Sequence, residues 1–506
     1  MKYDALIIFI FGILNTISFS PYDFWPASIF SIFGLLVIIN KYQYWKKIIF
    51  LGFIWGIGNF FSSIYWIYFS IYQFFELSFL ISIFLVFVLS VYLSLYPMIF
   101  VLLLQYFCTH INLKRFLIGA PSIWFFTEFL RGKIFTGFPW LELGYSQIDG
   151  PLKGIAPIFG VSGISCIIII ISGLISLSWT KKEIFPLILS FSILIILYPL
   201  NFLKWYTFDK QYIKIALVQG NVPQSLYFDN NQVNLILKKY MQITEPFLKV
   251  SKIIIWPESA IPCYDIICDN FLMNLDRKLK LKNSILITGI TSFYQSGYYN
   301  SIMLLGNDQS YEYNLKHKYN KHYLVPFGET LPIKNFFQPI LKKFGIFIFS
   351  LQRGKYLQPQ LNISNFHFTP SICYEIIFSE KIRNNVQSNT DFLLTISNDI
   401  WFGNTIGPWQ HLQMARMRAL ETGKTLLRSS NNGITAIINP DGTLKSKLPQ
   451  FVCDVLFEII SPSKGVTPYV FFGSMPIWII VIIFFIYSII YKFKLVELFE
   501  FFMKTR

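Results

Sequence analysis

Residues 370–376 have the sequence PSICYEI, in which an apolar run ends at Cys373 and is followed directly by Tyr374 and Glu375. Short apolar, β-rich strings of this kind recur between residues 206 and 470 and predict strands. They are IKIALVQG (213–220), KIIIWPE (252–258), SILITGI (284–290), FTPSICYE (368–375), DFLLTIS (391–397) and GITAIINP (433–440). Amphipathic stretches at 231–249, 267–281 and 408–422 predict helices between them. This alternation indicates an α/β domain.

Two further strings in this domain carry reactive groups. IIIWPES (253–259) places Glu258 at a strand end, beside a rigid Trp-Pro pair, and YNKHYLVPFGETLP (319–332) contains Lys321 and Glu329. Side chains at strand ends converge on a site in α/β folds, so we expect these residues to approach Cys373.

Covalent acyl transfer needs a nucleophile, a base and a group that stabilises the oxyanion. A thiol attacks a carbonyl as its thiolate, a carboxylate can remove the thiol proton, and an ammonium can stabilise the oxyanion that forms. Cys373, Glu258 and Lys321 supply one of each, and Glu329 and Glu375 could hold Lys321 charged and oriented. Each residue alone is more often ordinary core or surface. However, the sequence contains no HExxH, GxSxG, P-loop or GxGxxG motif that offers another chemistry, and nothing in it demands a metal or cofactor.

The first 205 residues contain one apolar run after another and predict a polytopic helical membrane domain. Hydrophobic residues make up 54% of the chain and charged residues 14%, where a soluble protein carries about a quarter charged residues. With a final span near the C-terminus, about eight spans are expected. They lie at about 4–20, 24–40, 49–71, 77–107, 115–131, 158–178, 184–203 and 475–491. The run 77–107 is expected to form one long helix, tilted or kinked at Pro97.

Loop charges predict the orientation of these spans. With the N-terminus inside, twelve basic residues fall on the inner side and three on the outer side, which fits the positive-inside rule. The predicted domains are therefore residues 1–205 with seven spans, 206–470 outside the cytoplasmic membrane, and 471–506 with one span and an inner tail. The inner residues are Lys2, Lys41, Lys46, Lys47, Lys114, Arg115, Lys181, Lys182, Lys492, Lys494, Lys504 and Arg506; the outer ones are Arg131, Lys133 and Lys153.

Other features of the composition narrow the function. The net charge of +16 comes partly from residues that flank spans, and no basic stripe with stacking aromatics suggests nucleic acid. Cys263 and Cys268 could close a short disulfide if they face an oxidising compartment. Glu128 is the one ionisable residue in a predicted span that could belong to a transport pathway.

The strings around Glu258, Lys321 and Cys373 resemble the Glu-Lys-Cys motifs of the nitrilase superfamily, whose fold is an αββα sandwich. More narrowly, the chain resembles the bacterial apolipoprotein N-acyltransferase family, in the order of its parts and in further strings. These are TGFPWLELGYSQ (136–147), ALVQGNVPQS (216–225), ISNDIWFG (396–403), GPWQHLQMARMRALE (407–421) and RSSNNGITA (428–436).

The resemblance implies Glu258 as general base, Lys321 as oxyanion stabiliser and Cys373 as nucleophile, with Glu329, Tyr374 and Glu375 in support. It implies a phospholipid acyl donor, a thioester on Cys373 and a diacylglyceryl apolipoprotein acceptor, at the outer, periplasmic side of a bacterial inner membrane. No cofactor and no metal are expected.

Three aromatic residues are candidates for substrate binding: Phe228, where the family has Trp; Trp401; and Trp140. Trp140 could admit acyl chains or could belong to an interfacial aromatic belt.

Two alternatives remain open at this point. A membrane-tethered amidase that hydrolyses a small amide would use the same three residues with water as acceptor. A transporter or scaffold with an outer ligand-binding domain is disfavoured because ionisable residues are scarce in the predicted spans.

Overall fold

The computed structural model describes the chain except residues 75, 224–225, 227–231, 296, 309–310, 313–317, 344–349 and 505–506. The chain forms two compact units. The first, here the helical unit, comprises Met1–Tyr72, Leu77–Leu203 and Phe471–Arg506. The second, here the sheet unit, comprises Gln73–Glu76 and Lys204–Val470. Each unit is described by itself below.

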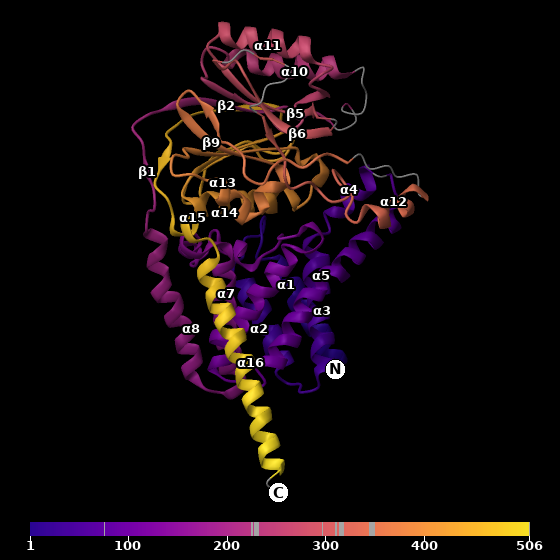
Figure 1. The fold of residues 1–506 in the computed structure, drawn as a ribbon, viewed down its shortest axis with the longest axis vertical. Coiled ribbons are helices and arrows are strands. Elements are labelled where there is room, and N and C mark those ends of the chain that lie inside the picture. Colours follow the sequence, from indigo (N-terminus) through magenta and orange to yellow (C-terminus); the bar gives the residue numbers. More distant parts are fainter. Residues whose placement is uncertain are drawn as a thin grey trace. The chain divides into compact units, whose positions relative to one another are not determined.

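Each predicted span corresponds to helical structure in the helical unit (Figure 1). Apolar runs form helices in a lipid environment because a helix satisfies its backbone hydrogen bonds internally. The helices are α1 (Lys2–Thr16), α2 (Pro26–Ile39), α3 (Trp45–Ser63), α4 (Ile67–Phe74), α5 (Phe79–Phe107), α6 (Ala120–Arg131), α7 (Ala156–Lys181), α8 (Ile184–Leu197) and α16 (Met475–Lys504). The prediction of one long helix over 77–107 is confirmed, with Pro97 inside α5.

The predicted count of about eight spans is not confirmed. Among the described residues, three helical segments are long and apolar enough to cross a membrane: Phe79–Phe107, Lys153–Lys181 and Ile184–Phe202. A fourth arises if the pair α3 and α4, bent by 58°, is one span. The helices α1, α2 and α6 have 15, 14 and 12 residues, fewer than the roughly 20 that a full crossing needs.

The described strands of the sheet unit form two large sheets. The seven-stranded sheet has the order β14-β2-β3-β5-β6-β7, with β4 beside β5, and the six-stranded sheet has the order β13-β12-β11-β10-β9-β8. The first contains β2 (Ile213–Gln219), β3 (Ile253–Ile255), β4 (Ile261–Tyr264), β5 (Ile285–Tyr294), β6 (Gly297–Leu305), β7 (Tyr319–Asn320) and β14 (Asp454–Ile460). The second contains β8 (Leu361–Ile363), β9 (Phe366–Ile372), β10 (Phe392–Ser397), β11 (Thr425–Ser430), β12 (Ala436–Ile438) and β13 (Leu444–Lys447).

The two sheets pack face to face between helices, which gives the expected αββα sandwich. Alternate residues of β2 point to opposite faces: Ile215 and Leu217 join a core shared with β9 and β10, whereas Ala216 and Val218 join a core with α10 and α11. Helices α10 (Val233–Thr244) and α11 (Asp269–Leu281) cover the outer face of the first sheet (Figure 1). Helices α13 (Ser379–Asn385) and α14 (Gly407–Thr422) cover the outer face of the six-stranded sheet (Figure 1).

Strand direction brings the site residues together. Strands β2, β3 and β5 are mutually parallel, and so are β9, β10 and β11, so their carboxyl ends lie at common edges. Cys373 follows β9 directly, and Glu258 comes three residues after the end of β3.

A small third sheet lies where the sheet unit begins and ends. Strand β1 (Thr207–Phe208) pairs antiparallel with β15 (Ser463–Lys464), with Thr207 opposite Lys464. The backbone amide of Asp209 also donates to the carbonyl oxygen of Pro462 at 2.9 Å. The first and last segments of the unit are therefore held side by side.

Candidate active site

A buried ammonium shared by two carboxylates is the centre of the site. Lys321 Nζ lies 3.1 Å from Glu258 Oε1 and 2.9 Å from Glu329 Oε1. The side-chain amide of Asn300, on β6, donates to the same two oxygens at 2.7 and 2.9 Å. The backbone amide of Asn398, after β10, donates to Glu258 Oε2 at 2.9 Å. The predicted Glu258, Lys321 and Glu329 are thus brought together.

The charge on Lys321 is maintained by its neighbours. Burial alone would lower its pKa, but the carboxylates of Glu258 and Glu329 outweigh burial and raise the pKa above its usual value. Glu329 is itself held by the backbone amide of Val325, which donates to Oε2 at 2.9 Å. Lys321 therefore stays an ammonium throughout the neutral range.

Cys373 occupies a turn that few residues adopt. Its φ is 51°, in the left-handed region, and its side chain is buried. Burial and the negative charge of Glu258 raise the pKa of the Cys373 thiol, and the opposing effect of Lys321 does not cancel them. The thiol is protonated near neutrality, so it needs a base before it can act as a nucleophile. Among the carboxylates that act on the thiol, Glu258 has the largest effect, followed by Asp399 and Glu329.

Glu375 holds the loop that carries Lys321 against the end of β9. Its Oε1 accepts from the backbone amides of His322 (2.8 Å) and Tyr323 (3.3 Å). Its Oε2 accepts from the hydroxyl of Tyr319 (2.7 Å) and the backbone amide of Ile372 (2.9 Å). A carboxylate is suited to this place because all four partners are donors. Glu375 thus fixes the spacing between Lys321 and Cys373.

Tyr374, the third predicted supporting residue, lies in a group of packed aromatic side chains. Its ring meets Phe378 edge-on at 5.3 Å, and Phe378 stacks on Tyr323 at 3.7 Å. Burial raises the pKa of the Tyr374 hydroxyl, so the side chain stays neutral.

A second polar cluster, which the sequence did not single out for any role, lies behind Cys373. His411 Nε2 is 3.2 Å from the carbonyl oxygen of Cys373, and its Nδ1 is 3.1 Å from Asp399 Oδ1. Arg428 Nη2 is 2.6 Å from Asp399 Oδ2. These residues lie in three strings quoted above (396–403, 407–421 and 428–436), but no local pattern in the sequence indicated that they would form a cluster. Among the described residues, no group of three or more His, Cys, Asp or Glu side chains is placed to hold a metal ion.

Of the three predicted substrate-binding residues, the structure describes Trp401 in the sheet unit and Trp140 in the helical unit. Phe228 lies outside the described residues. Trp401 is 37% exposed on the turn Asp399–Phe402, directly after the Asn398 that binds Glu258. Trp140 belongs to the helical unit, where it is 1% exposed and packs against Trp66 and Phe138.

Glu128, flagged as a possible pathway group, is paired in the helical unit. Its Oε1 lies 3.7 Å from Arg131 Nη2 and accepts from the backbone amide of Leu143 at 3.2 Å. Arg131 donates in turn to the carbonyl oxygen of Trp140 at 2.8 Å. The pair thus fixes the backbone of the segment that contains Trp140.

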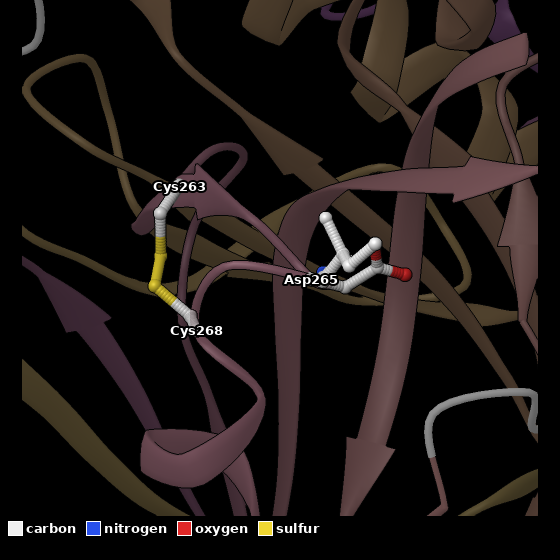
Figure 2. Close-up of a disulfide and its surroundings, with 4 residues drawn as sticks. Cys263, Asp265 and Cys268 are labelled. Carbon is white, nitrogen blue, oxygen red and sulfur yellow. A yellow bond between two sulfur atoms is a disulfide. The ribbon is translucent and has the colours of Figure 1, made fainter.

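Cys263 and Cys268 form a disulfide, which the sequence left open (Figure 2). Asp265, inside the closed loop, is fully buried and pairs with Lys318 Nζ at 2.7 Å. Its Oδ1 also accepts from the backbone amide of Phe293 at 2.9 Å. The disulfide loop thereby anchors the chain three residues before Lys321.

Comparison with known proteins covers nearly the whole chain. Residues 11–174 match the family model described as apolipoprotein N-acyltransferase N-terminal domain, and residues 214–464 match the carbon-nitrogen hydrolase model. The chain is 58% identical over 488 residues to the apolipoprotein N-acyltransferase of Wigglesworthia glossinidia brevipalpis, covering 96% of this chain and 98% of that protein. It is 39% identical over 471 residues to the protein of the same name from Vibrio parahaemolyticus, covering 92% and 93%.

Proposed function

This chain belongs to the apolipoprotein N-acyltransferase family and is an acyltransferase, and we propose that Glu258, Lys321 and Cys373 perform its reaction through an acyl thioester. The observation that carries this proposal is the Lys321 ammonium, shared by Glu258 and Glu329 at 3.1 and 2.9 Å and in electrostatic contact with Cys373. A base, an oxyanion stabiliser and a nucleophile are then adjacent in one buried site. Glu329 and Glu375 support the site by holding Lys321 and its loop.

In the first half-reaction, the acyl donor is a phospholipid. The sulfur of Cys373 bonds to the ester carbonyl carbon while Glu258 takes the thiol proton. Lys321 stabilises the oxyanion of the tetrahedral intermediate. The intermediate expels the glycerol oxygen, which takes the proton from Glu258 and leaves as lysophospholipid. The thioester remains on the enzyme.

In the second half-reaction, the acceptor is the α-amine of an N-terminal diacylglyceryl-cysteine, since the relatives are named for transfer to apolipoproteins. The amine loses one proton to solvent and attacks the thioester carbon. The carbon–sulfur bond breaks, and a second proton passes from the nitrogen through Glu258 to the sulfur. An amide and free Cys373 result, and donor and acceptor have used the site in turn.

The apolar helical unit supports lipid substrates, since extracting bilayer-bound chains into water would carry a large hydrophobic cost. The predicted loop charges and the Cys263–Cys268 disulfide both favour an oxidising, outer location for residues 206–470. We therefore place this catalytic domain at the periplasmic face of the inner membrane, between membrane domains 1–205 and 471–506.

Intact mass spectrometry tests the chemistry. The purified full-length enzyme is incubated with phospholipid alone, and the native chain is compared with Cys373→Ala. We expect a fatty-acyl mass increase on the native chain, removed by hydroxylamine, and none on the variant. An increase that persists in Cys373→Ala would overturn the assignment of the nucleophile. No increase on the native chain, together with release of ammonia from small amides, would support a tethered amidase instead.

Cys453 offers a test of orientation because it is exposed and not disulfide-bonded. A membrane-impermeant maleimide applied to intact spheroplasts is expected to label the native chain but not Cys453→Ser. Labelling that requires lysis of the spheroplasts would place the catalytic domain on the cytoplasmic side.

A further inference from the structure

The left-handed turn at Cys373 is held by hydrogen bonds on both of its sides. The backbone amide of Ile372 donates to Glu375, and the carbonyl oxygen of Cys373 lies 3.2 Å from His411 Nε2. A left-handed backbone is unfavourable for a non-glycine residue, so it persists only where the surroundings enforce it. The sequence predicted that Glu375 supports Lys321, but it predicted neither of these two hydrogen bonds at the turn.

His411 is enclosed by groups from three neighbouring elements. It is 1% exposed on α14 and faces Asp399, which follows β10, and Arg428, on β11. Its Nδ1 lies 3.1 Å from Arg428 Nη2 and 3.1 Å from Asp399 Oδ1, and its ring meets Phe402 at 5.8 Å. The guanidinium of Arg428 can only donate hydrogen bonds, so Nδ1 is placed to accept one from it.

The charges of the cluster select one form of the imidazole. Burial and the positive charge of Arg428 lower the pKa of His411, and Asp399 opposes them only in part. Burial would raise the pKa of Asp399, but Arg428 and His411 outweigh it and lower that pKa. Asp399 and Arg428 are therefore the ion pair, and His411 is neutral. With its single proton on Nε2, His411 donates to Cys373 and accepts from Arg428 at Nδ1. The other tautomer would donate from Nδ1 to Asp399 Oδ1, but it would set the Nε2 lone pair against the carbonyl oxygen of Cys373 and the Nδ1 proton against the guanidinium of Arg428.

We propose that His411 is a positioning residue, a neutral imidazole that donates from Nε2 to the carbonyl of Cys373 and holds the turn that aims the thiol, with Arg428 setting its tautomer. This inference rests on the proposed role of Cys373 as nucleophile. It predicts that His411 acts on the rate of thiol attack and not on the binding of lipid, because its contacts are with the backbone of Cys373 and with buried charges.

Two amide substitutions separate this role from a general structural one. The amide nitrogen of His411→Gln reaches as far as Nε2 and can donate to the Cys373 carbonyl, whereas that of His411→Asn reaches only the position of Nδ1. In single-turnover acylation of the full-length enzyme by phospholipid, we expect His411→Asn to lower the acylation rate constant by about 10- to 100-fold. We expect KM to change less than about threefold, and His411→Gln to recover most of the rate.

His367→Asn is the matched control. This histidine also lies beside an aspartate, with Nδ1 3.3 Å from Asp391 Oδ2, but it is at the other end of β9. Its variant is expected to acylate at the native rate.

Several outcomes would overturn the inference. A native acylation rate in His411→Asn would exclude the positioning role. Equal losses of acylation rate in His411→Asn and His411→Gln, together with equal drops in the thermal unfolding midpoint, would exclude it as well. Nitrogen-15 spectra of histidine-labelled enzyme, with the His411 signal identified by its loss in His411→Gln, are expected to show a protonated Nε2. A protonated Nδ1 with a bare Nε2 would contradict the tautomer. An acyl adduct on Cys373→Ala would instead overturn the proposed function of Cys373 as nucleophile.

Discussion

Replacing Glu375 by glutamine should weaken the link between the loop of Lys321 and the end of β9. The Glu375 carboxylate accepts four hydrogen bonds, from Ile372, Tyr319, His322 and Tyr323. A glutamine amide has one acceptor oxygen, so its NH2 group must face two of these donors. The hydroxyl of Tyr319 can turn to accept, which leaves the buried backbone amide of Ile372 without an acceptor.

The expected loss of folding free energy can be worked out from these contacts. One orphaned buried donor costs about 1–3 kcal/mol, and two bonds that lose a charged acceptor weaken by about 1 kcal/mol each. Relief from burying a charge offsets part of this sum, so we expect a net loss of about 3 kcal/mol. For a unit of this size that corresponds to a fall of about 6–12 °C in the thermal unfolding midpoint. Acylation should slow as well, because Lys321 is no longer held at its distance from Cys373.

Thermal unfolding of the full-length enzyme in detergent, followed by intrinsic fluorescence, measures the effect. Glu458→Gln is the matched control, because Glu458 is partly exposed and pairs with Lys445 at 3.3 Å. Such pairs contribute about 0–1 kcal/mol. A midpoint for Glu375→Gln that equals that of the control would refute the four-bond account of Glu375.

Three further substitutions test the site and its surroundings. Glu258 adds to burial in raising the pKa of the Cys373 thiol, so Glu258→Gln should lower that pKa and speed alkylation by iodoacetamide at neutral pH. Acyl adducts should no longer form. Slower alkylation would contradict the expected fall in the pKa. Lys321→Met leaves the buried carboxylate of Glu258 and the partly exposed carboxylate of Glu329 without their cation, and it should cost about 3–5 kcal/mol in thermal unfolding. Adding Glu329→Gln should restore part of that stability but no activity, and a further loss of stability would argue against the shared ammonium. Trp140→Ala should cost about 3–5 kcal/mol, because the ring is buried. An unchanged midpoint would contradict its packing, and normal deacylation of phospholipid would exclude a role in lipid access.

The sequence predicted the strands whose two faces are both apolar. β2, β5, β9 and β10 lie where expected because a strand between a helical layer and a second sheet is apolar on both faces. β11 (TLLRSS) was missed because four of its six residues are polar, although all of it is buried. Arg428 is stabilised there by Asp399, 29 residues earlier, and by the carbonyl oxygen of Ile434. A partner so distant along the chain leaves no local pattern.

The candidate site, too, could be predicted from the sequence only in part. Glu258, Lys321 and Cys373 could be named from their strings and their expected chemistry, and the structure brings Glu258 and Lys321 to 3.1 Å. Asn300, which bridges Glu258 and Glu329, could not be named, since an asparagine in the string GYYNSIMLL reads as an ordinary polar strand residue. Its role depends on the register of β6 against β5 and β7, which pairing alone determines.

The pairing of β1 with β15 has a consequence for how this protein can be rearranged. The sheet unit begins and finishes at adjacent points, because Thr207 and Phe208 lie opposite Lys464 and Ser463. A segment with neighbouring ends can be inserted into a host chain, or exchanged for a homologous one, as a single piece of coding sequence. Chimaeras that swap residues 206–470 between relatives should therefore fold at junctions near this ribbon. Circular permutants that join the ribbon with a short linker offer a route to obtaining the unit without its flanking helices.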